Sequence, residues 1–267
     1  MQIPTILINQ HAYLGKQCIL HVYRGSYAHG MYIPSSNPSS IDDIDTMAIT
    51  VPSIEHYLGL KSFGSRGTKE IKQGEWDIVV YEVRKAISLL SQGNPNILSL
   101  LWTDKIIKSS LAGRYLIRNR VLFSCKQVYR SFEGYARSQL KKMTQGAYQG
   151  YMGEKRKAMV DKFGYDTKNA AHLIRLLRMG NEFLVTGELA VDRSNNDADY
   201  LLQIKKGYFS LNYVKDLAID LFSQLDQSYR VSSLPERPDI DKVNKLCVNL
   251  ILLGLLRQSV NFRHRVN

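Results

Sequence analysis

Cysteine is scarce in this chain of 267 residues, and its three copies lie far apart. Cys18, Cys125 and Cys247 form no C-x-x-C pair, and none has a histidine at metal-ligand spacing. Both a structural zinc site and a disulfide framework need closely organised cysteines, so this spacing argues against both. We therefore expect a protein of the reducing cytoplasm.

Long apolar runs are also missing. The N-terminal sequence MQIPTILINQ has neither the basic start nor the apolar core of a signal peptide. The most apolar stretch, residues 246–256, is too short to span a bilayer and contains Asn249 and Gly254. We expect it to form a buried helix, with no membrane contact.

Three common catalytic motifs are absent from the sequence. There is no G-x-x-x-x-G-K-[ST] phosphate loop, no H-E-x-x-H zinc motif and no G-x-S-x-G nucleophile elbow. P-loop enzymes, zinc hydrolases of that type and serine hydrolases with that elbow therefore have little support.

Charge is abundant but uneven. The net charge is +12, while hydrophobic content (44%) is ordinary for a globular protein. Residues 1–110 hold 10 Lys and Arg against 9 Asp and Glu, whereas residues 111–267 hold 26 against 15. We expect two domains, a near-neutral catalytic domain (1–110) and a basic helical domain (111–267) that faces a polyanion. A generally basic, solubilising surface is the alternative.

The most informative stretch runs from Cys18 to Thr50. A short apolar run from residue 19 to 23 predicts a strand, which Arg24-Gly25-Ser26 ends. Glycine there lets the backbone approach a neighbouring group closely. After a Pro/Ser/Asn loop, Asp43 and Asp45 alternate at the start of a second apolar strand, so both carboxylates share one face.

Two neighbouring carboxylates repel each other unless a cation lies between them. A Mg²⁺ ion fits this need, and a turn with free N–H groups beside it suits a triphosphate. A clear strand at residues 75–82 begins near Asp77, which adds a third carboxylate if the strands are neighbours. Charges that are merely solvated at loop and strand ends are the alternative.

A long predicted helix at residues 167–187 has a basic stripe. Lys168, His172 and Arg175 fall at helical spacing on one side, whereas Leu173 and Leu177 lie on another. Such cations suit a triphosphate in a cleft between the domains. A solvated helix face is the alternative, and a hydrogen-bonded core position is a second one for His172.

The remaining pattern predicts mostly helices. We expect them at residues 4–15, 54–60, 84–92, 96–101, 128–142, 155–163, 167–187, 197–205, 210–229 and 239–260. Residues 62–69 read as a loop, and no strand is expected after about residue 110.

The motifs together resemble a known group. Gly25-Ser26, Asp43, Asp45 and Asp77 resemble the signature of the DNA polymerase β-like nucleotidyltransferase superfamily. More narrowly, the chain resembles the RNA-ligase-associated nucleotidyltransferase family. The blocks that carry this resemblance are residues 24–30, 81–85, 93–95, 134–139, 168–180, 186–188 and 233–238, in order across nearly the whole chain.

The resemblance implies an α+β fold, with a mixed-sheet catalytic domain followed by an all-helical one. It also implies transfer of a nucleoside monophosphate from an NTP to an acceptor hydroxyl, with two Mg²⁺ ions (or Mn²⁺). The implied metal ligands and catalytic residues are Asp43, Asp45 and Asp77, and the implied nucleotide-binding residues are Gly25, Ser26, Lys168, His172 and Arg175.

Two departures from the family pattern affect this assignment. The loop that contains residues 35–40 is longer than usual, which could reshape the acceptor side. Asp42 and Asp43 also adjoin, and we choose Asp43 as the leading carboxylate because it shares a strand face with Asp45.

The acceptor is expected to be RNA, a tRNA or an RNA end. Its contacts are expected from basic and aromatic positions of the second half, namely 141–142, 155–157 and 263–265 with Tyr148, Tyr151 and Phe262. Two other readings stay open: an antitoxin-like transferase that modifies a protein or small molecule, and a catalytically silent nucleic-acid-binding protein. The sequence assigns no oligomeric state.

Overall fold

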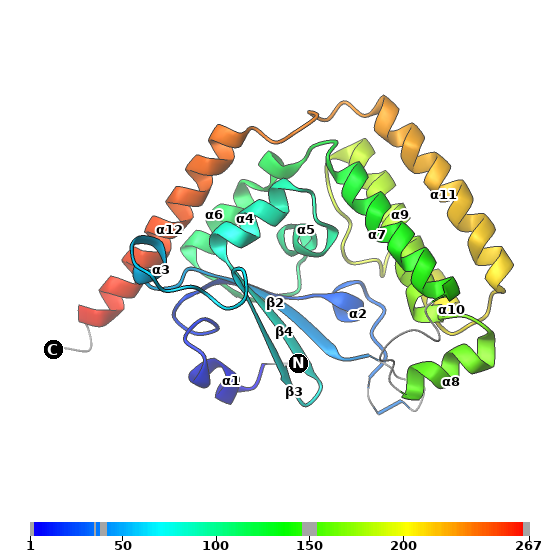
Figure 1. The fold of residues 1–267 in the computed structure, drawn as a ribbon, viewed down its shortest axis with the longest axis horizontal. Helices are drawn as coiled ribbons and strands as arrows, with labels where there is room; N and C mark the ends of the chain where they lie inside the picture. The colour runs from blue at the N-terminus through cyan, green and yellow to red at the C-terminus, as the bar shows by residue number, and fades with distance from the viewer. Residues whose placement is uncertain (1–2, 35, 38–41, 146–153, 264–267) are drawn as a thin grey trace.

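The computed structural model describes residues 3–34, 36–37, 42–145 and 154–263 (Figure 1). Its centre is a five-stranded sheet with the strand order β3-β4-β2-β1-β5. The strands are β1 (Cys18–Tyr23), β2 (Ile44–Thr50), β3 (Thr68–Gln73), β4 (Trp76–Glu82) and β5 (Ile106–Ser109). β2 and β4 are parallel and the other neighbours are antiparallel, so the sheet is mixed.

Each face of the sheet has its own apolar cluster, because alternate strand residues point to opposite sides. Val22, Met47 and Val79 belong to the larger cluster, which helices cover. These helices are α4 (Val83–Ser91), α5 (Pro95–Trp102) and α6 (Leu111–Arg118), and η1 (Arg120–Phe123) follows them. Ile44 and Ile78 belong to the second cluster, beside α1 (Thr5–Gln10). Two short helices, α2 (Gly25–Ala28) and α3 (Glu55–Leu58), follow β1 and β2.

Helix α9 (Thr167–Thr186) is the centre of the helical half. It packs against α7 (Val128–Gln145), α10 (Ala198–Lys205) and α11 (Leu211–Val231), while α8 (Glu154–Phe163) precedes it (Figure 1). Asp166 caps its start by accepting a hydrogen bond from the Asn169 N–H, and Gly187 ends it with a left-handed φ of 74°. The helix is therefore fixed at both ends.

The last helix, α12 (Ile240–Arg263), returns to the sheet half and packs on α4 and α6. Gly254 touches Val51, and Arg257 and Gln258 donate to the carbonyls of Cys18 and Val51 at 3.0 and 2.9 Å. Leu250 is buried. Leu252 and Leu256, however, are exposed, so the predicted buried helix is buried on one side only. No helix in the described ranges is both long and apolar enough to cross a membrane.

The fold is α+β, as the sequence predicts. Five elements were not predicted: α2, β3, β5, α6 and η1. β3 (TKEIKQ) is polar and half-exposed, and it exists because it pairs along its length with β4. β5 has four residues and pairs only at the sheet edge. α6 contains Gly113, a poor helix former whose missing side chain lets it pack on the Ile19 carbonyl.

Candidate active site

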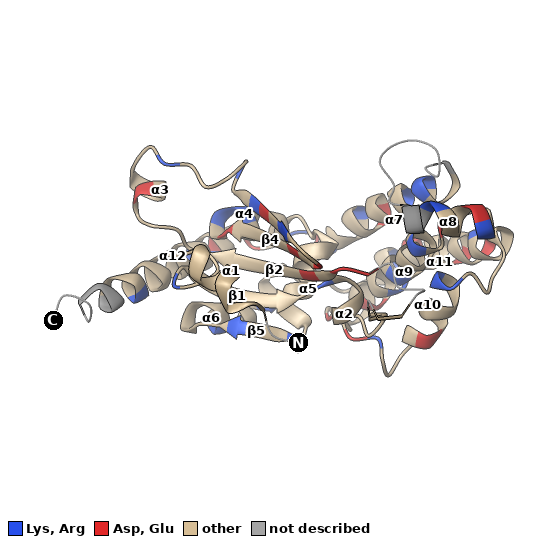
Figure 2. Ribbon diagram, turned by 90° about the horizontal axis from the view of Figure 1, so that it is seen from below, with Lys and Arg blue, Asp and Glu red and all other residues tan. Residues whose placement is uncertain are grey.

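Two carboxylates lie side by side where β2 and β4 begin. Asp45 and Asp77 are direct partners in the parallel register of these strands. The guanidinium of Arg24 lies within ion-pair distance of both, 3.5 Å from Asp45 Oδ1 and 3.8 Å from Asp77 Oδ1. Figure 2 shows acidic positions at the strand ends nearest to the helical half. The carboxylate pair therefore shares one cation.

The turn after β1 touches the same pair. Gly25 has φ +62°, and a Cβ added there would overlap the Asp45 carboxylate. The Arg24 N–H also donates to the Asp45 carbonyl at 2.9 Å. Only glycine combines this positive φ with so close an approach. The Gly25-Ser26 turn is thus held directly against the Asp45 carboxylate.

The pKa of Asp45 is raised above its ordinary value of 3.8. Burial is the main cause, and the charges of Asp77 and Asp43 act in the same direction, whereas Arg24 and Lys168 oppose them. Asp43 precedes β2 and is exposed. Within the described ranges, no group of three carboxylate, histidine or cysteine side chains is arranged as a ready metal site.

A cavity of about 200 Å³ connects this turn to α9. Six of the predicted site residues line it: Gly25, Ser26, Asp45, Lys168, His172 and Arg175. Asp77 adjoins it through Arg24, which is itself a lining residue. Asp43 does not line it. The cavity therefore brings the turn, one carboxylate and the three cationic or titratable residues of α9 together.

Arg175 is the most unusual of these residues. Its guanidinium donates to the Met179 sulfur at 3.2 Å, and within the described part of the chain no carboxylate forms an ion pair with it. Burial lowers the pKa of Arg175 to about 9, and the nearby charge of Arg193 contributes. A half-buried arginine that lines a cavity and forms no ion pair with a described carboxylate is suited to an anionic ligand.

Asp42 and Asp43 have different surroundings. Asp42 is buried, accepts a hydrogen bond from the Ile33 N–H at 3.0 Å, and forms ion pairs with Lys205 and Lys168. Lys205 is buried as well; burial lowers its pKa, whereas the charge of Asp42 raises it. Asp42 thus ties the segment before β2 to α9 and α10, which leaves Asp43 as the exposed one of the two.

Lys205→Met is expected to destabilise the fold by about 3–5 kcal/mol, because it leaves the buried Asp42 carboxylate without its main cation. Urea unfolding with the free energy of unfolding as readout tests this. Adding Asp42→Asn to Lys205→Met should recover much of the loss. If Lys205→Met unfolds at the wild-type urea concentration, the pair contributes nothing to stability.

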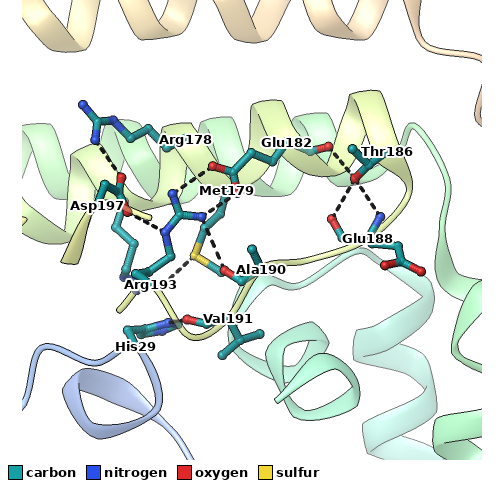
Figure 3. Close-up of polar contacts among 11 residues, drawn as sticks. His29, Arg178, Met179, Glu182, Thr186, Glu188, Ala190, Val191, Arg193 and Asp197 are labelled. Carbon is teal, nitrogen blue, oxygen red and sulfur yellow. Dashed lines mark hydrogen bonds and ion pairs between the residues drawn. The ribbon is translucent and has the colours of Figure 1, made fainter. Parts of the chain in front are cut away.

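A network around Arg193 connects the turn to the helical half (Figure 3). The buried Arg193 guanidinium forms ion pairs with Glu182 of α9 and with Asp197, where Nε lies 2.6 Å from Oδ1. The backbone N–H of Arg193 donates to the His29 carbonyl at 3.3 Å, and His29 Nδ1–H donates to the Val191 carbonyl at 2.8 Å. Burial lowers the pKa of His29 well below its usual value, so the ring is neutral. This network fixes α2 relative to α9.

Sequence reasoning missed several residues of the cavity. Arg24 is adjacent to the predicted turn, so the motif itself was a signal for it. His29 lies in the same block as Arg24, whereas Asn96 and Lys205 carry no local signal, because only the fold brings them to the cavity. Of the positions expected to contact RNA, Lys141 and Lys142 are exposed on α7. Lys157 is also exposed, and of residues 155, 156, 262 and 263 only the backbone is described. The other positions expected to contact RNA lie outside the described residues, as do residues 35 and 38–40 of the long loop.

The mixed sheet with paired aspartates, the Gly-Ser turn against them and the following helical half agree with the α+β arrangement that the sequence resemblance implies. Residues 7–249 match the RNA repair pathway DNA polymerase beta family, and the chain belongs to this family. The resemblance seen in the sequence is thereby confirmed.

The chain is similar to a nucleotidyltransferase-like protein from Exiguobacterium sibiricum 255-15, with 11% identity, a TM-score of 0.29, and coverage of 85% of this chain and 73% of that one. No curated protein matches the chain.

Proposed function

We propose that the protein transfers a nucleoside monophosphate from an NTP to a hydroxyl group of RNA, with the help of divalent metal ions. The observation that carries this proposal is one cavity shared by three parts. These are the Gly25-Ser26 turn, the Asp45 carboxylate paired in register with Asp77, and the Arg175 cation without a carboxylate partner. Membership of a polymerase β-like family supports the reaction class.

The carboxylates fit a hard divalent cation such as Mg²⁺ or Mn²⁺. Asp45 and Asp77 offer adjacent oxygen ligands, and Asp43 is a third carboxylate at the exposed edge. Burial and the neighbouring carboxylates Asp77 and Asp43 raise the pKa of Asp45, and a bound cation would oppose that rise. Such ions would activate the attacking hydroxyl and neutralise charge on the triphosphate.

The chain's own residues would bind and orient the NTP. The Gly25 N–H and the Ser26 hydroxyl would hold the β- and γ-phosphates, and Lys168, His172 and Arg175 would balance their charge from α9. The acceptor hydroxyl would then attack the α-phosphorus in line, with pyrophosphate leaving on the opposite side.

The catalytic carboxylates complete this scheme. Asp77 would help to take the proton from the attacking hydroxyl, while Asp43 and Asp45 hold the metal ions. Asp43 does not line the cavity, so its role requires the metal or the bound nucleotide to approach the exposed edge.

RNA is the favoured acceptor for two reasons. The second half of the chain carries the excess of positive charge, and Figure 2 shows Lys and Arg on several of its helices. The family to which the chain belongs is described as part of an RNA repair pathway. No observation favours a protein acceptor over RNA.

Arg175→Met is expected to weaken NTP binding while leaving the free protein as stable as the wild type or more so. The substitution removes a desolvated charge without a carboxylate partner and keeps apolar volume beside Met179. Thermal unfolding with and without NTP and EDTA tests both parts: the stabilisation by NTP should be lost in the variant. An unchanged stabilisation by NTP would remove Arg175 from the nucleotide site.

The proposed reaction is tested by label transfer from each of the four α-labelled NTPs with Mg²⁺. The acceptors are total small RNA and, separately, a protein lysate, and Asp43→Ala/Asp45→Ala is the control. Label on RNA that the double variant does not transfer is the expected result. Label on protein alone would favour the protein-modifying reading. If neither acceptor receives label that depends on Asp43 and Asp45, a nucleic-acid-binding protein without catalytic activity is favoured.

A further inference from the structure

A second, open cavity of about 610 Å³ adjoins the candidate active site. Asn96 lines both cavities. Tyr81, which lines the second one, lies four residues after Asp77 on β4 and therefore on the same face of the strand. Burial raises the pKa of Tyr81, whereas the positive charge of Arg24 lowers it. The second cavity thus lies next to the active-site cavity, on the strand face that carries Asp77.

A turn with a strained backbone conformation places an arginine at this cavity. Arg66 and Gly67 form a two-residue turn between Ser65 and Thr68, whose backbones exchange hydrogen bonds of 2.9 and 3.0 Å. Both turn residues have positive φ, 51° and 80°. Turns of this kind favour Asn-Gly, because a long side chain is strained at positive φ. An arginine at the first position is therefore better explained by its guanidinium than by the turn.

A second cation points to the same place. Gly67 packs directly on Lys85, where an added Cβ would lie 2.9 Å from the Lys85 Cβ, and both Arg66 and Lys85 line the cavity. Among the described residues, neither cation has an ion-pair partner. Glu70 also lines the cavity, so two cations stand against one carboxylate. The lining favours an anion.

Two half-buried tyrosines complete the lining. Tyr81 comes from β4 and Tyr135 from α7. The Tyr135 hydroxyl accepts a hydrogen bond from Asn94 Nδ2 at 3.0 Å, which fixes the ring. Aromatic rings beside cations are the combination that binds single-stranded nucleic acid, because bases stack on the rings and phosphates pair with the cations.

We propose that this cavity, the acceptor groove, binds the single-stranded end of the RNA that receives the nucleotide. Arg66 and Lys85 contact its phosphates, Tyr81 and Tyr135 stack on its bases, and the terminal hydroxyl reaches the carboxylates past Asn96. The identification of the RNA as the acceptor rests on the proposed function, whereas the binding of the strand does not.

The test is fluorescence anisotropy with a labelled single-stranded RNA of about twelve nucleotides and no NTP. Arg66→Asn and Lys85→Gln should each weaken binding by roughly tenfold and make the salt dependence shallower by about one unit of slope. Arg66→Asn should not lower the melting temperature, because asparagine suits the turn. Tyr135→Leu should weaken binding, and Tyr135→Phe should restore it.

The matched control is Lys61→Asn, which removes one exposed positive charge that does not line the groove. It should bind RNA like the wild type. If Arg66→Asn binds the RNA with wild-type affinity, or if Lys61→Asn loses as much affinity as Arg66→Asn, the acceptor groove is not the RNA-binding site. RNA binding that depends on Arg66, without any nucleotidyl transfer, would contradict the proposed function but would still support RNA binding by the acceptor groove.

Discussion

Asp45→Asn is expected to lower the rate of nucleotidyl transfer by about a thousandfold or more, because removal of a ligand to the metal forfeits several kcal/mol of transition-state stabilisation. Steady-state kinetics with labelled NTP measures the loss. Asp104→Asn is the matched control, since it removes an exposed carboxylate that does not line the active-site cavity. Wild-type transfer by Asp45→Asn would remove this residue from the reaction.

The same variant should not lose stability, which separates catalysis from folding. The pKa of Asp45 in the folded protein is raised above 3.8, so its ionisation costs stability as pH rises through the folded pKa. In EDTA, Asp45→Asn should therefore be as stable as the wild type below about pH 4 and more stable at neutral pH. A variant less stable than the wild type at pH 7 would contradict this account of the site's electrostatics.

Gly25→Ala is expected to cost both activity and stability. The new methyl group overlaps the Asp45 carboxylate, and alanine at φ +62° adds about 1–2 kcal/mol of backbone strain. Displacement of Asp45 from the turn should reduce transfer by about a hundredfold. Kinetics and urea unfolding of the same preparation measure the two effects.

Gly74 provides the matched control. It has φ +59° in the turn between β3 and β4, and a Cβ there would have nothing within 4 Å. Gly74→Ala should therefore show the backbone strain alone, with normal transfer. Equal effects of the two substitutions on transfer would mean that the contact of Gly25 with Asp45 does not matter.

The carboxylate pair was predictable because its signal is local. The alternation of Asp43 and Asp45 before an apolar run, and a second strand that begins near Asp77, suffice to place acidic residues at strand starts. The sequence places Asp77 beside Asp45 only if their two strands are neighbours. The structure shows that β2 and β4 are neighbours, with Asp45 and Asp77 in register.

The partners of these residues were not predictable, because they depend on distant contacts. The different surroundings of Asp42 and Asp43 arise from Lys205, which lies 163 residues after Asp42. Arg193 likewise connects α9 to a turn at the other end of the chain. β3 was hidden because its polar sequence is stabilised by pairing with β4 and not by burial.

We propose that the Gly25-Ser26 turn, the aspartates and the cations of α9 act together in nucleotidyl transfer. The most direct test is a pair of reactions with wild-type protein, Mg²⁺ and small RNA, in which the same NTP carries its label on the α- or on the γ-phosphate. Label on RNA is expected from the α-position only. Labelled pyrophosphate is expected from the γ-position, and neither product is expected with Asp45→Asn. Label on RNA from the γ-position would identify phosphoryl transfer in place of nucleotidyl transfer.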